Sequence, residues 1–241
     1  KKYDVQAPRY TSYPPANHFV EEASANEYSR YLNQKLSHKS AALEPLSLYV
    51  HIPFCHDICY YCACNKIVTR DPHQATQYLQ SMENEITLKS AFFPRSKPIN
   101  QLHLGGGTPT FLSEAEIMWL MHLLATNFEL VDDTSREYSI EVDPRTVNAS
   151  SLALLAGLGF NRISMGIQDF DPDVQRAIHR VQPYSMIEEL VDSVRQNQFA
   201  SLNFDLIYGL PLQSIKSMRE MLEKVIALAP DRIAVYNYAH M

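Results

Sequence analysis

Ten residues, from Cys55 to Cys64, contain all four cysteines of the 241-residue chain. Cys55, Cys59 and Cys62 lie so close together that one loop must carry their sulfurs around a compact centre. A four-iron cluster has that shape, and with three protein ligands one iron stays open to a small chelating molecule. We therefore predict that these three cysteines bind an iron–sulfur cluster.

Other uses of the cysteines are open at this level of argument. Structural zinc sites usually draw on paired ligands separated by a dozen or more residues, a spacing that four neighbouring cysteines do not offer. A redox pair at Cys59 and Cys62 would leave Cys55 and Cys64 without a function. Disulfides are rare in the reducing cytosol. The cluster is thus favoured over all three.

Composition restricts the function classes. The chain is 46% hydrophobic and 20% charged, enough for one sizeable core, and its net charge of -6 gives no basic footprint for nucleic acid. We find neither a signal peptide nor an apolar run of membrane-spanning length, so we expect a cytoplasmic protein with reduced thiols and no membrane span. We also expect a monomer. Because the chain is acidic overall, any anionic ligand would have to be bound by positively charged side chains near its site.

The elements that position the cysteines follow an alternating pattern. Short segments typical of strands alternate with apolar residues at spacings of three and four, which are typical of helices. The predicted strands cover residues 47–52, 99–104, 137–142, 162–166, 202–207 and 232–237. The predicted helices cover residues 26–43, 75–86, 117–124, 152–158, 187–194 and 218–228. Ser113 with Glu116, and Ser185 with Glu188, predict two capping boxes.

Long crossovers between these strands predict a parallel sheet with right-handed connections. Polar or glycine-rich residues follow nearly every strand, including a glycine run at 105–107 that, taken alone, indicates a tight turn. Because such residues at successive strand ends must face one another, we predict an α/β fold with a partial (β/α)6 barrel rather than a doubly wound sheet. Residues 1–45 would form an N-terminal arm and helix, and residues 46–241 the barrel.

The cysteine spacing, Cys-x3-Cys-x2-Cys after the first strand with Tyr61 before the last cysteine, resembles that of the radical S-adenosylmethionine enzymes. The resemblance implies a [4Fe-4S] cluster whose open iron is chelated by the amino and carboxylate groups of S-adenosyl-L-methionine. An electron from the cluster then releases a 5'-deoxyadenosyl radical. The glycine motif of this family, which lets the methionyl group approach bare backbone, matches Gly105, Gly106, Gly107 and Thr108.

Within that superfamily, five segments resemble the oxygen-independent coproporphyrinogen III oxidases. The matching segments are residues 8–14, 49–55, 62–70, 139–145 and 205–211. The resemblance implies oxidative decarboxylation of two propionates of coproporphyrinogen III to vinyls, giving protoporphyrinogen IX in haem biosynthesis. It also implies two S-adenosylmethionine molecules per product, a tetrapyrrole substrate and an electron donor protein. Haem delivery is the alternative function, because haem chaperones share the cysteine triad and the glycine run.

The resemblance also assigns candidate roles. Those for the first S-adenosylmethionine are Tyr49, Gly106, Gln168, Arg180, Asp205 and the backbone of Ala239. Glu141 would be catalytic and shared with the second S-adenosylmethionine region. Cys64 would be catalytic without binding the cluster, and it favours an oxidase over a chaperone.

Each of these residues has a simpler alternative. Glu141 and Asp205 could cap loops, and Gln168 could bond at its strand end. Arg180 could be a surface cation of a helix beginning at Asp171. Tyr49 could belong to the core, because aromatic residues favour strands.

The substrate carries four carboxylates, so cations beside the strand ends are candidates to bind it. They are Arg9, Lys66, Arg70 and Arg145. Members of the family continue beyond a sixth strand into a last barrel helix and a mostly helical C-terminal domain, which are absent from this chain. We therefore expect the 241 residues alone to be inactive.

Overall fold

The structure is a computed structural model that describes residues 18–19, 24–36, 44–95 and 97–239. The chain separates into two units, residues 1–43 and residues 44–241. In the first unit, α1 (Ala25–Leu36) confirms the start of the predicted helix. The remainder of that prediction, residues 37–43, lies outside the described residues, as do the predicted arm at 1–17 and Arg9.

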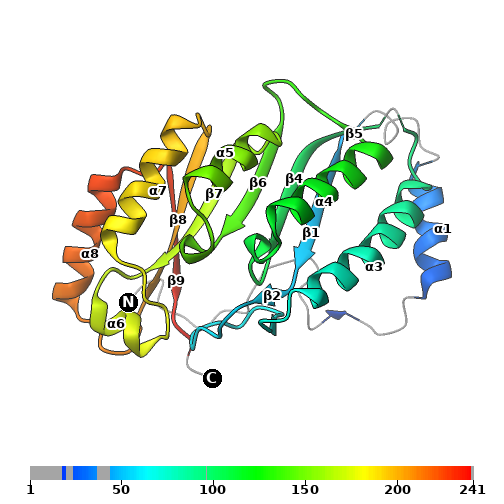
Figure 1. The fold of residues 1–241 in the computed structure, drawn as a ribbon. Helices are drawn as coiled ribbons and strands as arrows, with labels where there is room; N and C mark the ends of the chain where they lie inside the picture. The colour runs from blue at the N-terminus through cyan, green and yellow to red at the C-terminus, as the bar shows by residue number, and fades with distance from the viewer. Residues whose placement is uncertain (1–17, 20–23, 37–43, 96, 240–241) are drawn as a thin grey trace, which may run out of the picture. The chain divides into compact units, whose positions relative to one another are not determined.

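The larger unit is built on a parallel sheet (Figure 1). Its main strands follow one another in chain order across the sheet. They are β1 (Leu46–Ile52), β4 (Pro98–Gly106), β6 (Glu137–Val142), β7 (Arg162–Gln168), β8 (Ser201–Tyr208) and β9 (Arg232–Asn237). Each predicted strand is confirmed to within two residues. The short β5 (Glu129–Leu130) also pairs with β4, while β2 (Phe54–Cys55) and β3 (Ile67–Val68) form a separate parallel pair.

The unbroken strand order decides between the two sheet types. A doubly wound sheet reverses its strand order at a switch point, which places helices on both faces. Here the longer helices of the larger unit stand along one face of the sheet (Figure 1). They are α3 (His73–Ser90), α4 (Glu114–Asn127), α5 (Ala149–Gly157), α7 (Tyr184–Gln196) and α8 (Ile215–Leu228). The predicted partial-barrel arrangement is confirmed.

Alternate residues of each strand have opposite environments. In β6, Tyr138, Ile140 and Val142 are buried in the hydrophobic core, whereas Ser139 and Glu141 between them are polar and partly exposed. Burying one large apolar side chain contributes about 1.5–3 kcal/mol, so the helix-covered face supplies most of the stability. The opposite face borders a cavity of about 790 Å³. The sheet therefore has one dry, packed face and one polar face.

Short helices follow the C-terminal ends of three strands, and we call this end of the sheet the rim. The 3-10 turns η2 (Pro109–Phe111) and η3 (Pro144–Thr146) follow β4 and β6, and α6 (Pro172–Ala177) follows β7. The side chain of Asp171 caps α6 by accepting from the backbone of Asp173 and Val174. Figure 1 shows α6 and β2 at the end of the sheet toward which the strands point.

One of the two predicted capping boxes is confirmed. Ser113 accepts from the backbone of Glu116, and the Glu116 carboxylate accepts in return from the backbone of Ser113. The box predicted at Ser185 is wrong. Helix α7 begins at Tyr184, one residue before Ser185, and its N-cap is Pro183. The proline ring holds the extended entry to the helix, which leaves Ser185 inside the first turn.

These two serines make a matched pair of variants. Ser113→Ala should lower the free energy of unfolding by about 1 kcal/mol, because it removes the side-chain acceptor at the start of α4. Ser185→Ala should change it by less than about 0.5 kcal/mol, as at an ordinary surface site. Urea denaturation of both variants measures the difference. Equal losses would contradict the assignment of the caps.

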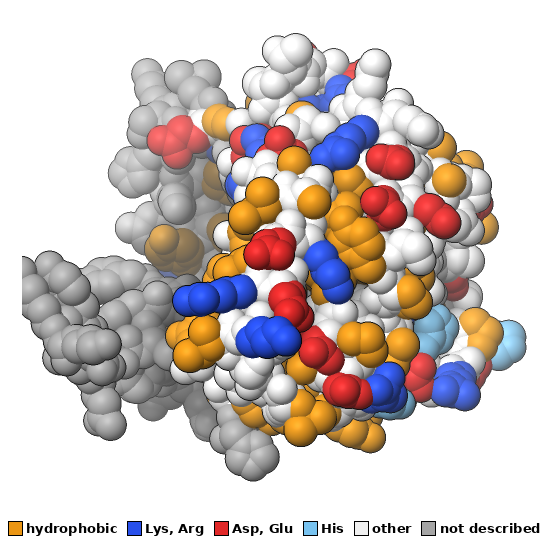
Figure 2. Space-filling view, turned by 90° about the vertical axis from the view of Figure 1, so that its left-hand side faces the viewer, with side chains coloured by type: hydrophobic (Ala, Val, Ile, Leu, Met, Phe, Trp, Pro, Cys, Tyr) orange, Lys and Arg blue, Asp and Glu red, His pale blue; other side chains and the backbone are white. Residues whose placement is uncertain are grey.

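In the larger unit, the side of the molecule that carries α8 mixes charges of both signs with exposed apolar side chains (Figure 2). Leu212, Ile215 and Ile226 are exposed on α8 and the loop before it. A face with mixed charges does not attract a polyanion. Within the described ranges, we find no helix with the length and apolar character needed to cross a membrane.

Candidate metal and cofactor site

The cysteine loop and the strand ends enclose a cavity of about 370 Å³. Most of the predicted site residues line it together. They are Cys55, Cys59, Tyr61, Cys62, Cys64, Gly106, Gly107, Thr108, Glu141, Gln168, Arg180 and Asp205. Tyr49 lines the neighbouring cavity of about 790 Å³ instead, Gly105 is not among the lining residues of either, and Ala239 is exposed at the end of the described chain.

The segment after α6 holds the cysteine loop in place. The backbone of Tyr60 donates to the carbonyl of Ile178 at 3.1 Å, and Nδ1 of His179 donates to the carbonyl of Ile58 at 2.8 Å. The His179 ring also stacks on Tyr60, with centroids 5.3 Å apart. Tyr61 packs against a small apolar cluster that includes Ile178. The loop is therefore positioned by contacts that do not depend on a bound metal.

Two of the three consecutive glycines allow the end of β4 to approach this loop. A Cβ atom on Gly107 would lie 2.6 Å from the carbonyl oxygen of Pro53, and one on Gly106 would lie 2.7 Å from that of Ile52. Gly106 also has a φ of +121°, which disfavours other residues. The backbone of Gly107 donates to the Ile52 carbonyl at 2.9 Å. These glycines thus both line the cavity and bring two chain segments into contact.

The thiols of the loop differ in their surroundings. A hydrogen bond from the Cys64 thiol lowers the pKa of Cys62, against the opposing effect of burial and with help from Lys66. The Lys66 amine donates to the carbonyl oxygens of Cys62 at 2.8 Å and Cys64 at 3.5 Å. Burial raises the pKa of Cys55, although Thr108 opposes this with a contact at 3.5 Å. Cys62 therefore ionises more readily than Cys55.

The donor set fits a cluster. In the part of the chain that the structure describes, no group of three or more His, Cys, Asp or Glu side chains is arranged around a single metal ion. A four-iron cluster does not need such convergence, because each thiolate binds a different iron. Soft thiolates on one loop around one cavity are a suitable donor set for iron–sulfur chemistry.

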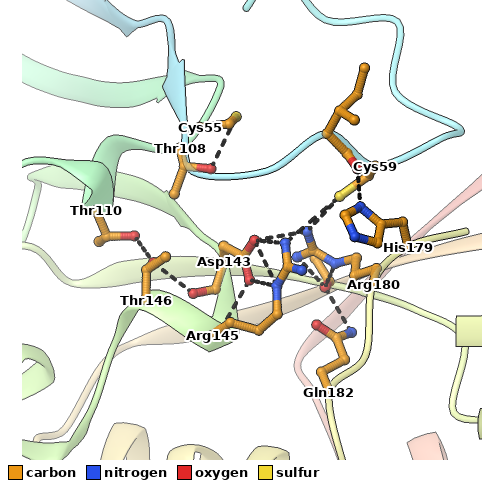
Figure 3. A network of polar contacts seen from close by, with 12 residues as sticks. Cys55, Cys59, Thr108, Thr110, Asp143, Arg145, Thr146, His179, Arg180 and Gln182 are labelled. Atoms are coloured by element: carbon orange, nitrogen blue, oxygen red, sulfur yellow. Dashed lines mark hydrogen bonds and ion pairs between the residues drawn. The ribbon is translucent and has the colours of Figure 1, made fainter. Parts of the chain in front are cut away.

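A buried ionic network adjoins Cys59 (Figure 3). The Asp143 carboxylate accepts from Nη2 of Arg145 at 2.6 Å and from Nη1 of Arg180 at 2.9 Å. Burial alone would raise the pKa of Asp143, but the hydrogen bonds and charge of Arg145 and the charge of Arg180 outweigh it and hold this pKa below its ordinary value. Asp143 was not among the predicted site residues, although it stands two residues after Glu141 at the same strand end.

Arg180 is not the surface cation of the simpler alternative, because it is only 6% exposed and lies beyond the end of α6. Its Nη2 donates to the Gly166 carbonyl at 2.8 Å. A Cβ atom at position 166 would come within 2.9 Å of the same nitrogen, so Gly166 makes room for the guanidinium. Sequence reasoning missed Gly166 because its role depends on a residue in another segment.

The remaining rim residues are held by specific contacts. Oε2 of Glu141 accepts from the backbone of Gly106 at 3.3 Å, and its Oε1 lies 3.1 Å from Nε2 of His103. Asp205 accepts from Ser164 and Asn203, each at 3.0 Å. Burial raises the pKa of Asp205 despite these two hydrogen bonds. The Asp205 contacts are with side chains, so Asp205 caps no loop in them, whereas Glu141 does accept from a backbone N–H where β4 ends and the next loop begins.

Two further site residues have unusual settings. Gln168 is buried at the end of β7 with a φ of +67°, a conformation that is uncommon outside glycine. Tyr49 is 55% exposed, so its alternative assignment to the core is wrong. The Tyr49 ring stacks on His103 with centroids 5.6 Å apart, and its hydroxyl lies 2.9 Å from Nδ1 of His51.

The two cavities share Glu141, Ser164 and Asp205 in their linings. The cavity beside the cysteine loop therefore adjoins the cavity on the polar face of the sheet. The candidate substrate cations with described side chains already have partners. Arg70 pairs with Asp57 at 2.7 Å, Arg145 with Asp143, and Lys66 with loop carbonyls.

The Asp143 network predicts a specific acid sensitivity. Because the folded pKa of Asp143 lies below the ordinary value of about 3.9, its ionic contacts stabilise the fold above that pH and are lost as pH falls through the folded pKa. The free energy of unfolding should therefore drop below about pH 4, and Asp143→Asn should remove this part of the drop. Urea denaturation across that pH range tests it, with the exposed Asp192→Asn as the control. Parallel pH profiles of wild type and Asp143→Asn would contradict the assignment.

Comparison with known proteins agrees with this geometry. The profile of the radical SAM superfamily matches residues 49–225. The chain is 47% identical over its whole length to oxygen-independent coproporphyrinogen III oxidases of Pseudomonas aeruginosa and Escherichia coli, of which it spans 52% and 51%. The chain thus spans about half the length of these curated relatives.

Comparison with solved structures agrees with the sequence comparison. The structure of coproporphyrinogen III oxidase (HemN) from Escherichia coli superposes with a TM-score of 0.89 at 46% identity, covering 96% of this chain and 51% of that one. A structure named anSMEcpe with bound AdoMet and Kp18Cys peptide shares the fold alone, with a TM-score of 0.57 at 14% identity over 81% of this chain and 52% of that one. The profile match covers well over half of the sequence. The chain belongs to the radical SAM superfamily.

Proposed function

We propose that this chain is the cofactor-binding part of an oxygen-independent coproporphyrinogen III oxidase. The reaction is the oxidative decarboxylation of two propionates of coproporphyrinogen III to vinyls, which yields protoporphyrinogen IX. The observation that carries the proposal is the 47% identity over the whole chain to proteins of that name. It is supported by the gathering of the cysteines, the glycine run and the rim residues around one cavity.

In this proposal Cys55, Cys59 and Cys62 would hold a [4Fe-4S] cluster whose remaining iron would be open to S-adenosylmethionine. Once bound, the cluster and S-adenosylmethionine would supply a 5'-deoxyadenosyl radical to take a hydrogen atom from the propionate carbon next to the ring. Formation of each vinyl would also release carbon dioxide and one electron, which passes to an electron acceptor. The low pKa of Cys62 favours the thiolate form that binds iron. Lys66 fixes the loop through two carbonyl oxygens, so little ordering is needed when the cluster binds.

The chain's other site residues would orient the cofactor. Gly106, Gly107 and Thr108 present backbone at the end of β4, where the methionyl group would lie. Glu141 stands where the two cavities meet, which suits a residue that contacts both cofactor regions. Gln168, Arg180 and Asp205 line the same wall. The adjoining polar cavity would admit a propionate side chain toward the cofactor site.

The test is anaerobic cluster reconstitution followed by coproporphyrinogen III, S-adenosylmethionine and a low-potential reductant. Formation of vinyl product, measured by chromatography and by carbon dioxide release, supports the proposal when the protein is complete. The 241-residue chain tests the cofactor half separately, through iron content and binding of S-adenosylmethionine. Haem transfer to an acceptor protein without decarboxylation would contradict the oxidase function and support haem delivery by a chaperone instead.

A further inference from the structure

Cys59 has a different environment from that of a simple loop cysteine. Its side chain is buried, and two guanidinium groups approach its sulfur (Figure 3). Nη1 of Arg180 lies 3.5 Å and Nη2 of Arg145 lies 3.7 Å from Sγ of Cys59. These distances are within hydrogen-bonding range for sulfur, so both groups donate to this thiol or thiolate.

The group around Cys59 has a fixed charge. Arginine stays protonated in proteins, so Arg145 and Arg180 contribute two positive charges and the ionised Asp143 contributes one negative charge. The side chains of Asp143 and Arg180 are each only 8% exposed, which limits screening by solvent. The result is a net positive charge held directly beside one sulfur.

The position of this charge does not depend on a ligand. Nε and Nη2 of Arg180 donate to the Gly166 carbonyl at 3.2 and 2.8 Å, while Asp143 fixes its other end. Arg145 is held by Nε contacts of 3.0 and 3.2 Å to the Asp143 carboxylate. Both guanidiniums are therefore oriented toward Cys59 by the fold.

We propose that Asp143, Arg145 and Arg180 form a charge-setting triad that raises the reduction potential of the cluster through Cys59. The inference rests on the proposed function, because it requires Cys59 to be a cluster ligand. Reduction adds one negative charge to the cluster, and a fixed positive charge nearby stabilises the reduced form more than the oxidised one. Cluster potentials respond to net charge and to hydrogen bonds at the sulfurs. The three residues are positioning residues in this role, since they act through the cysteine.

The sign of the effect gives a sharp test on the reconstituted chain. Arg145→Gln removes one positive charge and should shift the cluster's reduction equilibrium toward the oxidised form by about tenfold, which for one electron is about 59 mV. Asp143→Asn removes the negative charge and should shift it in the opposite direction. Arg145→Lys keeps the charge and should restore most of the wild-type value. Arg176→Gln, on the exposed surface of α6, should leave it unchanged.

Redox titration followed by electron paramagnetic resonance measures these shifts, with iron content determined on every variant. Opposite shifts for the two neutralising variants support the triad, because a merely structural defect would not change sign. Shifts in the same direction, or none, at full iron content would overturn the triad and leave the proposed function standing. A wild-type chain that binds no cluster would overturn both.

Discussion

Cys59→Ala should bind almost no iron after anaerobic reconstitution, whereas the wild-type chain should bind roughly four irons. With only Cys55 and Cys62 left as proposed ligands, two of the four irons, the open one included, would lack a protein ligand, and the cluster would not be held. Removal of the Cys59 thiol would also leave the guanidinium groups of Arg145 and Arg180 without the sulfur to which they donate. Iron and sulfide analysis, with visible absorption, measures the loss.

Cys64→Ser is the matched control for this variant. Cys64 lies in the same loop and cavity, but we predict that it is not a cluster ligand. A serine hydroxyl can still donate to Cys62, so iron content should remain near that of the wild type. Turnover of the complete enzyme should nevertheless fall, because we predict a catalytic role for Cys64. Loss of the cluster in Cys64→Ser would contradict the division of the four cysteines.

Gly107→Ala should lower the free energy of unfolding by about 1–3 kcal/mol and reduce cluster binding. The added Cβ would lie 2.6 Å from the Pro53 carbonyl oxygen and 2.8 Å from that of Phe54. Both contacts are with backbone, which cannot rotate away as a side chain would. The end of β4 and the segment entering the cysteine loop must therefore separate, which displaces Cys55. Urea denaturation and iron analysis report the two effects.

Gly157→Ala provides the comparison. A Cβ atom at Gly157, in the last turn of α5, would meet no atom within 4 Å. Alanine is the better helix former, so this variant should be neutral or more stable by up to about 1 kcal/mol. It should bind iron as the wild type does. Comparable destabilisation by both alanines would show that the close backbone approach at Gly107 is unimportant.

The strands and most helices could be predicted because their signals are local. Apolar residues alternate along β6 and recur at helical spacing along α4, and each pattern matches the face that the structure buries. The error at Ser185 was also local, since a serine followed three residues later by glutamate fits a cap equally well. Pro183 sets the helix start, because its fixed φ suits the N-cap position of a helix that begins at Tyr184.

Much of the candidate site could be located from the strand ends, but not the contacts within it. Arg180 reaches Cys59 across 121 residues of sequence and needs the small Gly166 to do so. No local pattern encodes such an approach. Asp143 was overlooked for a similar reason, because its importance lies in the two arginines that it pairs rather than in its neighbours along the strand.

The two-faced sheet gives this unit a form of mutational independence. The packed face of β8 is made by Leu202, Phe204 and Leu206, while Asn203 and Asp205 between them line cavities. Substitutions at the second set would change the shape and polarity of the ligand space without altering the packing against the helices. The scaffold can therefore acquire new ligand preferences while its folding determinants stay constant, because the two kinds of residue alternate along the same strands.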